Sequence, residues 1–207
     1  MVRKFNTFIL TVLCIFIPNG LIAGTLFLLI DVSNSISEEQ LELQISAYRY
    51  AMSDMVFLDH TRIEVITFSA NAIHLSSGSR LDAYSAFSNY QRTIGATCLE
   101  LALFKVEQLL PRLTPPFILD ISGDGFPNCY LSEEVPNILD RLAEHGVRVN
   151  TLLLTENVES KEDRSSLLQY YSSLTRNNGF SMVIDTNDHF LEAIYNKIVM
   201  EVATILK

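Results

Sequence analysis

Residues Leu26–Ser35 read LFLLIDVSNS, and this stretch decides the fold that we expect for the chain. Five consecutive apolar residues, Leu26–Ile30, indicate a strand that is buried on both faces of a parallel sheet. Asp31 follows the strand, and Ser33 and Ser35 stand at alternate positions after it. In open α/β sheets ligands bind beyond the carboxyl ends of the strands, so these polar side chains lie where a site is expected.

The donor atoms of these side chains decide which ligand such a site would favour. Carboxylate and hydroxyl oxygens are hard ligands, which suit Mg²⁺, Mn²⁺ or Ca²⁺ and suit Zn²⁺ or copper poorly. Asp, Ser and Asn after a strand are also common turn and helix-cap residues, so the motif alone does not distinguish a metal site from a turn. The hypothesis of a metal site therefore needs ligands from other parts of the chain.

The first 23 residues differ in kind from the rest of the chain. Two bases, Arg3 and Lys4, precede the almost wholly apolar run Phe5–Ile17, and a Pro-Asn-Gly break follows it. This layout is typical of a secretory signal peptide, so we expect residues 1–23 to be removed and residues 24–207 to form one domain. The alternative is an uncleaved membrane anchor. After cleavage we expect no membrane span and a periplasmic or secreted location.

Composition supports one globular domain and argues against nucleic acid as a partner. The chain has 207 residues, of which 48% are hydrophobic and 19% charged, which suffices for a substantial core. Without Arg3 and Lys4 its 15 bases fall to 13 against 24 acids, a formal charge of −11. A surface of that sign repels phosphate backbones, whereas it is compatible with binding a cation.

Strands alternate with helices along the rest of the sequence. Further strands are predicted at Arg62–Phe68, Ala72–Leu75, Pro115–Ser122, Arg148–Leu154 and Phe180–Ile184. Helices are predicted from a capping box at Ser37 to before Asp59, at Leu81–Tyr90, from Thr97 to Leu110, at Leu131–His145, at Ser165–Arg176 and from Asn187 onward. The alternation predicts an α/β fold with a doubly wound, Rossmann-like and mostly parallel six-stranded sheet, one short antiparallel edge strand and helices on both faces.

Two later loops place further oxygen ligands near the ends of strands. Thr97 is predicted to cap the helix that follows it, and capping alone would be an ordinary role for a Thr. Asp124 stands between Gly123 and Gly125 after the fourth strand, where the glycines let the chain turn sharply and leave the carboxylate at the sheet edge. Asp120, inside that strand, is interpreted as a buried and hydrogen-bonded carboxylate.

The three pieces DVSNS, GAT and SGDG resemble the metal-ion-dependent adhesion site (MIDAS) of von Willebrand factor A (VWA) domains. The family pattern is Asp-x-Ser-x-Ser, a distant Thr and an Asp-Gly pair after the fourth strand, and the resemblance covers essentially the whole mature chain. It implies that Ser33, Ser35 and Thr97 offer hydroxyl oxygens to an ion. It also implies that Asp31 and Asp124 hold the ion directly or through water.

The function implied by this resemblance is metal-dependent binding of a protein ligand. With few charged ligands, a bound Mg²⁺ (or Mn²⁺ or Ca²⁺) keeps waters or an open position, which a Glu or Asp carboxylate of the partner can take. The later segments also look like one bacterial subfamily of secreted VWA-like proteins of unknown function. The residues that carry this second likeness are Ile121–Gly125, Tyr170-Tyr171 with Gly179-Phe180, and Phe190–Ala203.

Two cysteines, Cys98 and Cys129, belong to the mature chain. An even pair in an exported protein suggests a disulfide, and two unpaired buried thiols are the alternative. Cys98 follows Thr97 directly and Cys129 lies five residues after Asp124, so a bridge would join two loops of the site. This pair is not part of the general VWA pattern.

Enzyme classes find little support in the sequence, and we expect the chain not to be an enzyme. A phosphatase of the haloacid dehalogenase type needs a second Asp where this chain has Ser33. The nucleophile elbow of serine hydrolases, Gly-x-Ser-x-Gly, does not occur in the sequence. His74 is interpreted as a partly exposed strand residue and not as a metal ligand. The alternatives to a metal-dependent module are a metal-free VWA-like scaffold and a metal-dependent hydrolase.

Overall fold

The computed structural model describes residues 23–156, 158, 160–186 and 190–205. The predicted signal peptide, apart from Ala23, and the predicted start of the closing helix at 187–189 lie outside the described residues. The strands are β1 (Gly24–Asp31), β2 (Thr61–Phe68), β3 (Ala72–Gly78), β4 (Phe117–Gly123), β5 (Val147–Leu154) and β6 (Ser181–Ile184). The α-helices are α1 (Glu38–Asp54), α2 (Arg80–Ser88), α3 (Leu99–Leu109), α4 (Val135–Glu144), α5 (Lys161–Leu174) and α6 (Phe190–Ile205).

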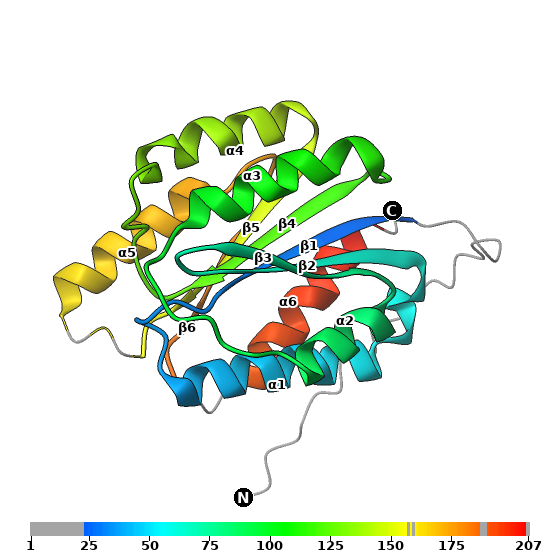
Figure 1. The fold of residues 1–207 in the computed structure, drawn as a ribbon, viewed down its shortest axis with the longest axis horizontal. Helices are drawn as coiled ribbons and strands as arrows, with labels where there is room; N and C mark the ends of the chain where they lie inside the picture. The colour runs from blue at the N-terminus through cyan, green and yellow to red at the C-terminus, as the bar shows by residue number, and fades with distance from the viewer. Residues whose placement is uncertain (1–22, 157, 159, 187–189, 206–207) are drawn as a thin grey trace, which may run out of the picture.

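The six strands form one sheet in the order β3-β2-β1-β4-β5-β6. All neighbouring strands are parallel except β2 and β3, which pair antiparallel at one edge. Helices α1, α2 and α6 cover one face of the sheet, and α3, α4 and α5 cover the other (Figure 1). The predicted doubly wound architecture is confirmed.

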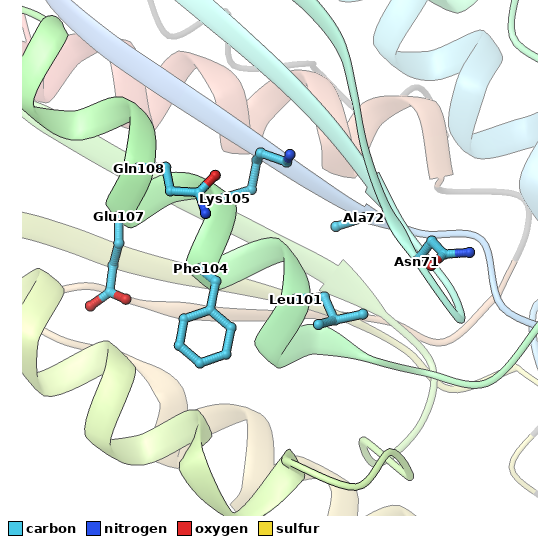
Figure 2. A pocket seen from close by; sticks show the side chains of 7 residues that line it. All are labelled: Asn71, Ala72, Leu101, Phe104, Lys105, Glu107 and Gln108. Atoms are coloured by element: carbon cyan, nitrogen blue, oxygen red, sulfur yellow. The ribbon is translucent and has the colours of Figure 1, made fainter.

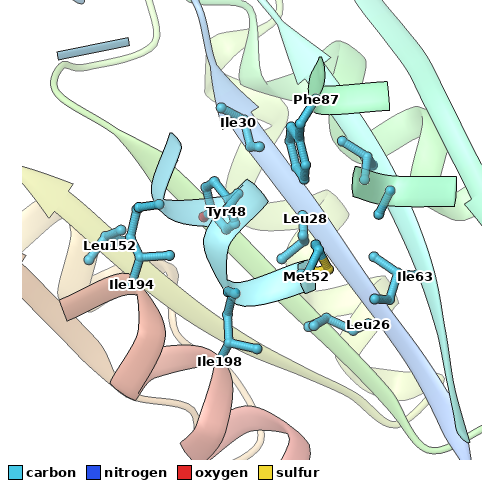
Figure 3. Close-up of a cluster of buried hydrophobic side chains, with 14 of the residues drawn as sticks. Leu26, Leu28, Ile30, Tyr48, Met52, Ile63, Phe87, Leu152, Ile194 and Ile198 are labelled. Atoms are coloured by element: carbon cyan, nitrogen blue, oxygen red, sulfur yellow. The ribbon is translucent and has the colours of Figure 1, made fainter. Parts of the chain in front are cut away.

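Strand β1 lies at the centre of the sheet and is buried along its whole length. Alternate side chains point to opposite faces of a strand, and Leu28 and Ile30 accordingly enter the core under α1 and α6, whereas Phe27 and Leu29 enter the core under α3 and α4. In the first core the ring of Tyr48 stacks on Phe87 (Figure 3). The continuous apolar run thus reflects burial on both faces.

Helix α1 begins directly after the loop that follows Asp31, and its start has the predicted capping box. The Ser37 side chain accepts a hydrogen bond from Gln40 N, and the Gln40 side chain accepts one from Ser37 N. This reciprocal pair satisfies two backbone donors that the helix itself leaves unpaired. It therefore fixes where the loop after β1 must end.

Several predicted boundaries differ from the structure, and three of these differences have a clear local reason. Strand β3 continues to Gly78 and does not end at Leu75, because Ser77 bonds across to the β2 side chain Glu64 beyond a bulge. Helix α5 begins at Lys161, since Ser160 caps it by accepting from Asp163 N. Helix α3 has Cys98 at its cap position and no side-chain cap, so Thr97 is not the cap that we predicted.

A buried charge cluster lies between the sheet and α6. Lys197 forms ion pairs with Asp120 of β4 and with Glu201 one turn along its own helix, and all three side chains are at most 1% exposed. Asn150 donates to Glu201 at 3.1 Å, and Tyr48 Oη donates to Asp120 at 3.4 Å. Burial raises the pKa of Glu201 to about 7, and the negative charge of Asp120 adds to that rise. The prediction that Asp120 is a buried, hydrogen-bonded carboxylate is confirmed.

Within the part of the chain that the structure describes, no helix combines the length and the apolar character needed to cross a bilayer.

Candidate metal centre

Three loops meet at the carboxyl edge of the sheet (Figure 1). The loops after β1 and β4 are neighbours because these strands pair in parallel, so their carboxyl ends lie side by side. The segment between α2 and α3 is tied to the first loop by Asn34 N, which donates to Gly95 O at 3.0 Å. It is tied to the loop after β4 by Thr97 N, which donates to the Asn128 side chain at 2.8 Å.

Oxygen atoms from all three loops form one continuous chain of contacts, with hydroxyls from the first two loops and a carboxylate from the loop after β4. Thr97 Oγ1 donates to Ser33 Oγ at 3.0 Å, and Ser33 Oγ lies 2.9 Å from Ser35 Oγ. Ser35 Oγ in turn donates to Asp124 Oδ1 at 2.6 Å. Asp31 stands behind this chain, with its Oδ1 accepting from Ser33 N at 2.8 Å. The structure thus brings together all five residues that the sequence singled out.

The two carboxylates of this cluster are poorly solvated. Asp31 is fully buried, and its Oδ2 has no hydrogen-bond partner among the described residues. Burial raises the pKa of Asp31 to about 7, and the charge of Asp124 adds to the rise, whereas the hydrogen bonds from Ser33 oppose it. Burial also raises the pKa of Asp124. Without a cation, the fold therefore holds both acids in surroundings that disfavour their charge.

This arrangement fits a hard divalent cation. A buried carboxylate oxygen without a partner calls for an explanation, and a binding site for an ion is one. Three neutral hydroxyls and two carboxylates form an all-oxygen donor set, which suits Mg²⁺, Mn²⁺ or Ca²⁺. Residues Asp31, Ser33, Ser35, Thr97 and Asp124 are referred to below as the oxygen cluster.

Arg92 holds the loop after β1 in place, and sequence reasoning missed it. Its Nη2 donates to the backbone carbonyls of Ser33 at 2.6 Å and of Ile36 at 2.5 Å, and its Nε donates to Val32 O at 3.4 Å. One guanidinium thus binds three carbonyls of a single turn. This fixes the backbone from which the side chains of Ser33 and Ser35 reach the other members of the oxygen cluster. A lone Arg in a connecting segment carries no sequence pattern from which this role could be inferred.

Tyr171 of α5 contacts the loop after β4 next to the oxygen cluster. Its hydroxyl donates to Gly125 O at 3.3 Å, and burial raises the pKa of Tyr171 well above 10, with the charges of Asp31 and Asp124 adding to the rise. A Cβ atom on Gly123 would lie 2.5 Å from this hydroxyl and 3.0 Å from Asp31 Oδ2. Only glycine therefore lets β4 end this close to both groups.

A disulfide joins Cys98 to Cys129, as predicted, with 5.2 Å between their Cα atoms. It links the start of α3 to the loop after β4, next to the pairing of Thr97 with Asn128. The side chain of Glu100 lies beside the two sulfur atoms. The bridge therefore fastens two of the three loops of the oxygen cluster to each other.

Replacing Cys98 and Cys129 together by Ser is expected to lower the free energy of unfolding by about 3–4 kcal/mol, because the open chain regains the entropy that a bridged loop of this length loses. Urea titrations followed by circular dichroism, with and without a reducing agent, measure the loss. Wild type and the double variant should coincide once the reducing agent is present. A difference that persists there would show that the serines, and not the missing bridge, cause the destabilisation.

A surface hollow of about 560 Å³ lies near this edge but outside the oxygen cluster. It is bounded by the turn between β2 and β3 and by one side of α3 (Figure 2), and its lining comprises Asn71, Ala72, Leu101, Phe104, Lys105, Glu107 and Gln108. No member of the oxygen cluster lines it, and its polar side chains do not converge on one point (Figure 2). We assign it no function.

Known structures share this fold at low sequence identity. Proximal thread matrix protein 1 from the mussel byssus has a TM-score of 0.66 at 14% identity, over 86% of this chain and 45% of its own. The pilus adhesin SpaC from Lactobacillus rhamnosus GG has a TM-score of 0.69 at 12% identity, over 89% and 30%. The vWF domain of the type V pili tip protein Mfa5 from Porphyromonas gingivalis has a TM-score of 0.68 at 8% identity, over 88% and 96%.

These likenesses establish a VWA fold. The chain spans less than half the length of the mussel protein and of SpaC. Another structure of the mussel protein is described as having a zinc-occupied MIDAS motif. No curated protein matches the sequence. The family model described as "Protein of unknown function (DUF1194)" matches residues 84–206.

Proposed function

This chain belongs to the DUF1194 family, whose description assigns no activity, and we propose from the geometry of its oxygen cluster that it is an exported, metal-dependent protein-interaction module. The observation that carries the proposal is the unbroken series of contacts from Thr97 through Ser33 and Ser35 to Asp124, with a buried Asp31 oxygen left unpartnered. This set of groups is costly to bury without a cation and well suited to binding one.

Each member of the oxygen cluster has a distinct part in this proposal. Ser33, Ser35 and Thr97 would offer neutral hydroxyl oxygens, and Asp31 and Asp124 would balance the charge directly or through water. A bound divalent cation would supply a positive centre that accepts a Glu or Asp carboxylate of the partner protein. Mg²⁺ is the ion that we propose, with Mn²⁺ or Ca²⁺ as alternatives, because an oxygen-only set with few charges suits it.

A binding role is favoured over catalysis by the groups that surround the cluster. Arg92 is engaged with backbone carbonyls, and Tyr171 stays protonated because its pKa is raised well above 10. Neither group is suited to accept a proton from a substrate at neutral pH. The proposal is therefore adhesion or recognition, with the metal-dependent hydrolase and the metal-free scaffold as outcomes that the test below distinguishes.

Export is part of the same proposal. The basic and apolar layout of residues 1–23 supports a signal peptide. A disulfide between Cys98 and Cys129 also favours an oxidising compartment. Two of the proteins that share the fold are described as a pilus adhesin and a pili tip protein, which agrees with a role outside the cytoplasm.

Adding Mg²⁺ at 100 times its dissociation constant is expected to stabilise the folded protein by about 2.7 kcal/mol. For a domain of this size that corresponds to a rise in melting temperature of about 5–10 °C. The rise should disappear in Asp31→Ala, which removes one charged ligand. Differential scanning calorimetry in Mg²⁺ or in EDTA measures it.

The matched control is Glu144→Ala, which removes one carboxylate at the end of α4, just before β5 begins at the opposite edge of the sheet. This variant should keep the whole rise. No shift with Mg²⁺, Mn²⁺ or Ca²⁺ in either wild type or control would favour the metal-free scaffold. Hydrolysis of generic phosphate or ester substrates that is lost in Asp31→Ala would favour the hydrolase.

A further inference from the structure

Large apolar side chains are exposed beside the oxygen cluster. Tyr130 is 95% exposed, Ile94 is 73% exposed and Phe126 is 45% exposed. These three residues are referred to as the apolar rim. Exposed apolar side chains that gather at one place mark sites of protein interaction, and Tyr and Phe are enriched in such sites.

Each residue of the apolar rim is adjacent in sequence to a group that holds the cluster together. Ile94 precedes Gly95, whose carbonyl accepts from Asn34 N in the loop after β1. Phe126 follows Gly125, where a Cβ atom would lie 3.8 Å from Ser35 Oγ. The rim therefore flanks the oxygen cluster from the segment before α3 and from the loop after β4.

The backbone at Tyr130 is held by its neighbour in the sequence, the disulfide-bonded Cys129. The ring of Phe126 packs on Tyr170 of α5 with 5.2 Å between the ring centres. These contacts anchor the backbone of the loop before any partner arrives. A loop whose backbone is already held loses little backbone entropy when it binds, which favours its use in recognition.

We propose that the apolar rim is the contact surface for a protein segment in which a Glu or Asp stands between apolar side chains. This inference rests on the proposed function, since the central acid of the segment would be the group that reaches the cation. Apolar contacts around a central ionic contact exclude water from it, and charges attract more strongly in such a low-dielectric setting. The rim thus provides the surroundings in which a single carboxylate contact becomes strong.

Acidic side chains outside the apolar rim restrict which residues can stand at the ends of the bound segment. Glu38 and Glu39 at the start of α1, and Glu133 shortly after Tyr130, are exposed acids on the same loops and helix starts. They would repel acidic side chains at the ends of the segment and attract Lys or Arg there. The same acids, on a chain of net charge −9, oppose docking of a second copy of this chain.

A display library of peptides with a fixed central Glu and randomised flanks tests the proposal on the full chain in Mg²⁺. Selected peptides should carry apolar residues next to the Glu and bases outside them, and binding should vanish in EDTA. The double variant Ile94→Ser/Tyr130→Ser should lose about tenfold or more in affinity for these peptides. The matched control Val56→Ser/Leu81→Ser removes two apolar side chains that are 63% and 60% exposed, far from the cluster, and should bind as wild type does.

The Mg²⁺-dependent rise in melting temperature, measured on the same proteins, separates this inference from the proposed function. An intact rise in the double variant, with peptide affinity lost, supports the apolar rim as the contact surface. An intact rise with unchanged peptide affinity, with no apolar preference among selected peptides, or with no peptide selected at all overturns the rim and leaves the cation site standing. Absence of the rise in wild type overturns the proposed function itself.

Discussion

In the absence of divalent cations, Asp31→Asn is expected to be more stable than wild type at pH 8, by up to about 4 kcal/mol. The folded protein raises the pKa of Asp31 from 3.8 to about 7 by burial. Folded wild type therefore holds a proton that the unfolded chain has already released between about pH 4 and 7, and its stability falls as the pH rises through that window. Asn carries no charge to bury and can still accept the hydrogen bond from Ser33 N, so the variant escapes this loss.

In excess Mg²⁺ wild type should be more stable than Asp31→Asn, because binding of the cation stabilises wild type and not the variant. Urea midpoints in EDTA at pH 5 and pH 8, and again in Mg²⁺, measure both parts. Glu144→Gln, an exposed acid at the far edge of the sheet, should follow wild type throughout. If Asp31→Asn were destabilised equally at both pH values in EDTA, the Asp31 carboxylate would stabilise the metal-free fold. Burying its charge would then not cost the stability that we infer.

Lys197→Met is expected to lower the free energy of unfolding by about 3–5 kcal/mol, because it leaves buried charge without a counter-charge. Lys197 pairs with both Asp120 and Glu201. Burial opposes the charge of Lys197, but the two carboxylates outweigh that effect and raise its pKa, so the side chain is a cation at neutral pH. Chemical denaturation of wild type and variant at pH 7 measures the loss.

Two further variants locate the cause of that loss. Adding Asp120→Asn and Glu201→Gln to Lys197→Met removes the orphaned charges and should recover much of the stability, since whole buried charge clusters are often replaceable without net cost. Lys161→Met, at the exposed start of α5, should have an effect within about 0.5 kcal/mol. A loss of the same size in the triple variant would mean that Lys197 stabilises α6 through its packing alone.

Most of the fold could be predicted from local patterns in the sequence. The apolar run of β1, the polar residues that follow it, and the capping box at Ser37 each depend on neighbours within a few positions, and all three stand in the structure as predicted. The five residues of the oxygen cluster could be selected because each stands at the end of a strand or in a loop beside the carboxyl edge of the sheet. Parallel pairing of β1 with β4 then brings two of those loops together.

Contacts between distant segments could not be predicted from such patterns. Arg92 binds carbonyls of the loop after β1, about sixty residues earlier in the chain, and nothing near Arg92 indicates this. Lys197 lies in the buried stripe of α6, opposite Asp120 of β4, and only its spacing from Glu201 hints at an ion pair. Thr97 could be placed near a helix start, but only the structure shows its hydroxyl turned toward Ser33 and away from the cap position.

The measurement that tests the central claim most directly is anomalous diffraction from crystals of the protein soaked in Mn²⁺. We predict one strong peak within about 2.1–2.3 Å of the hydroxyl oxygens of Ser33 and Ser35, with Thr97 in its coordination shell. The peak should be absent in Asp31→Ala crystals treated in the same way. Wild-type crystals with no peak at the oxygen cluster at millimolar Mn²⁺, or with their only peak elsewhere, would contradict the account.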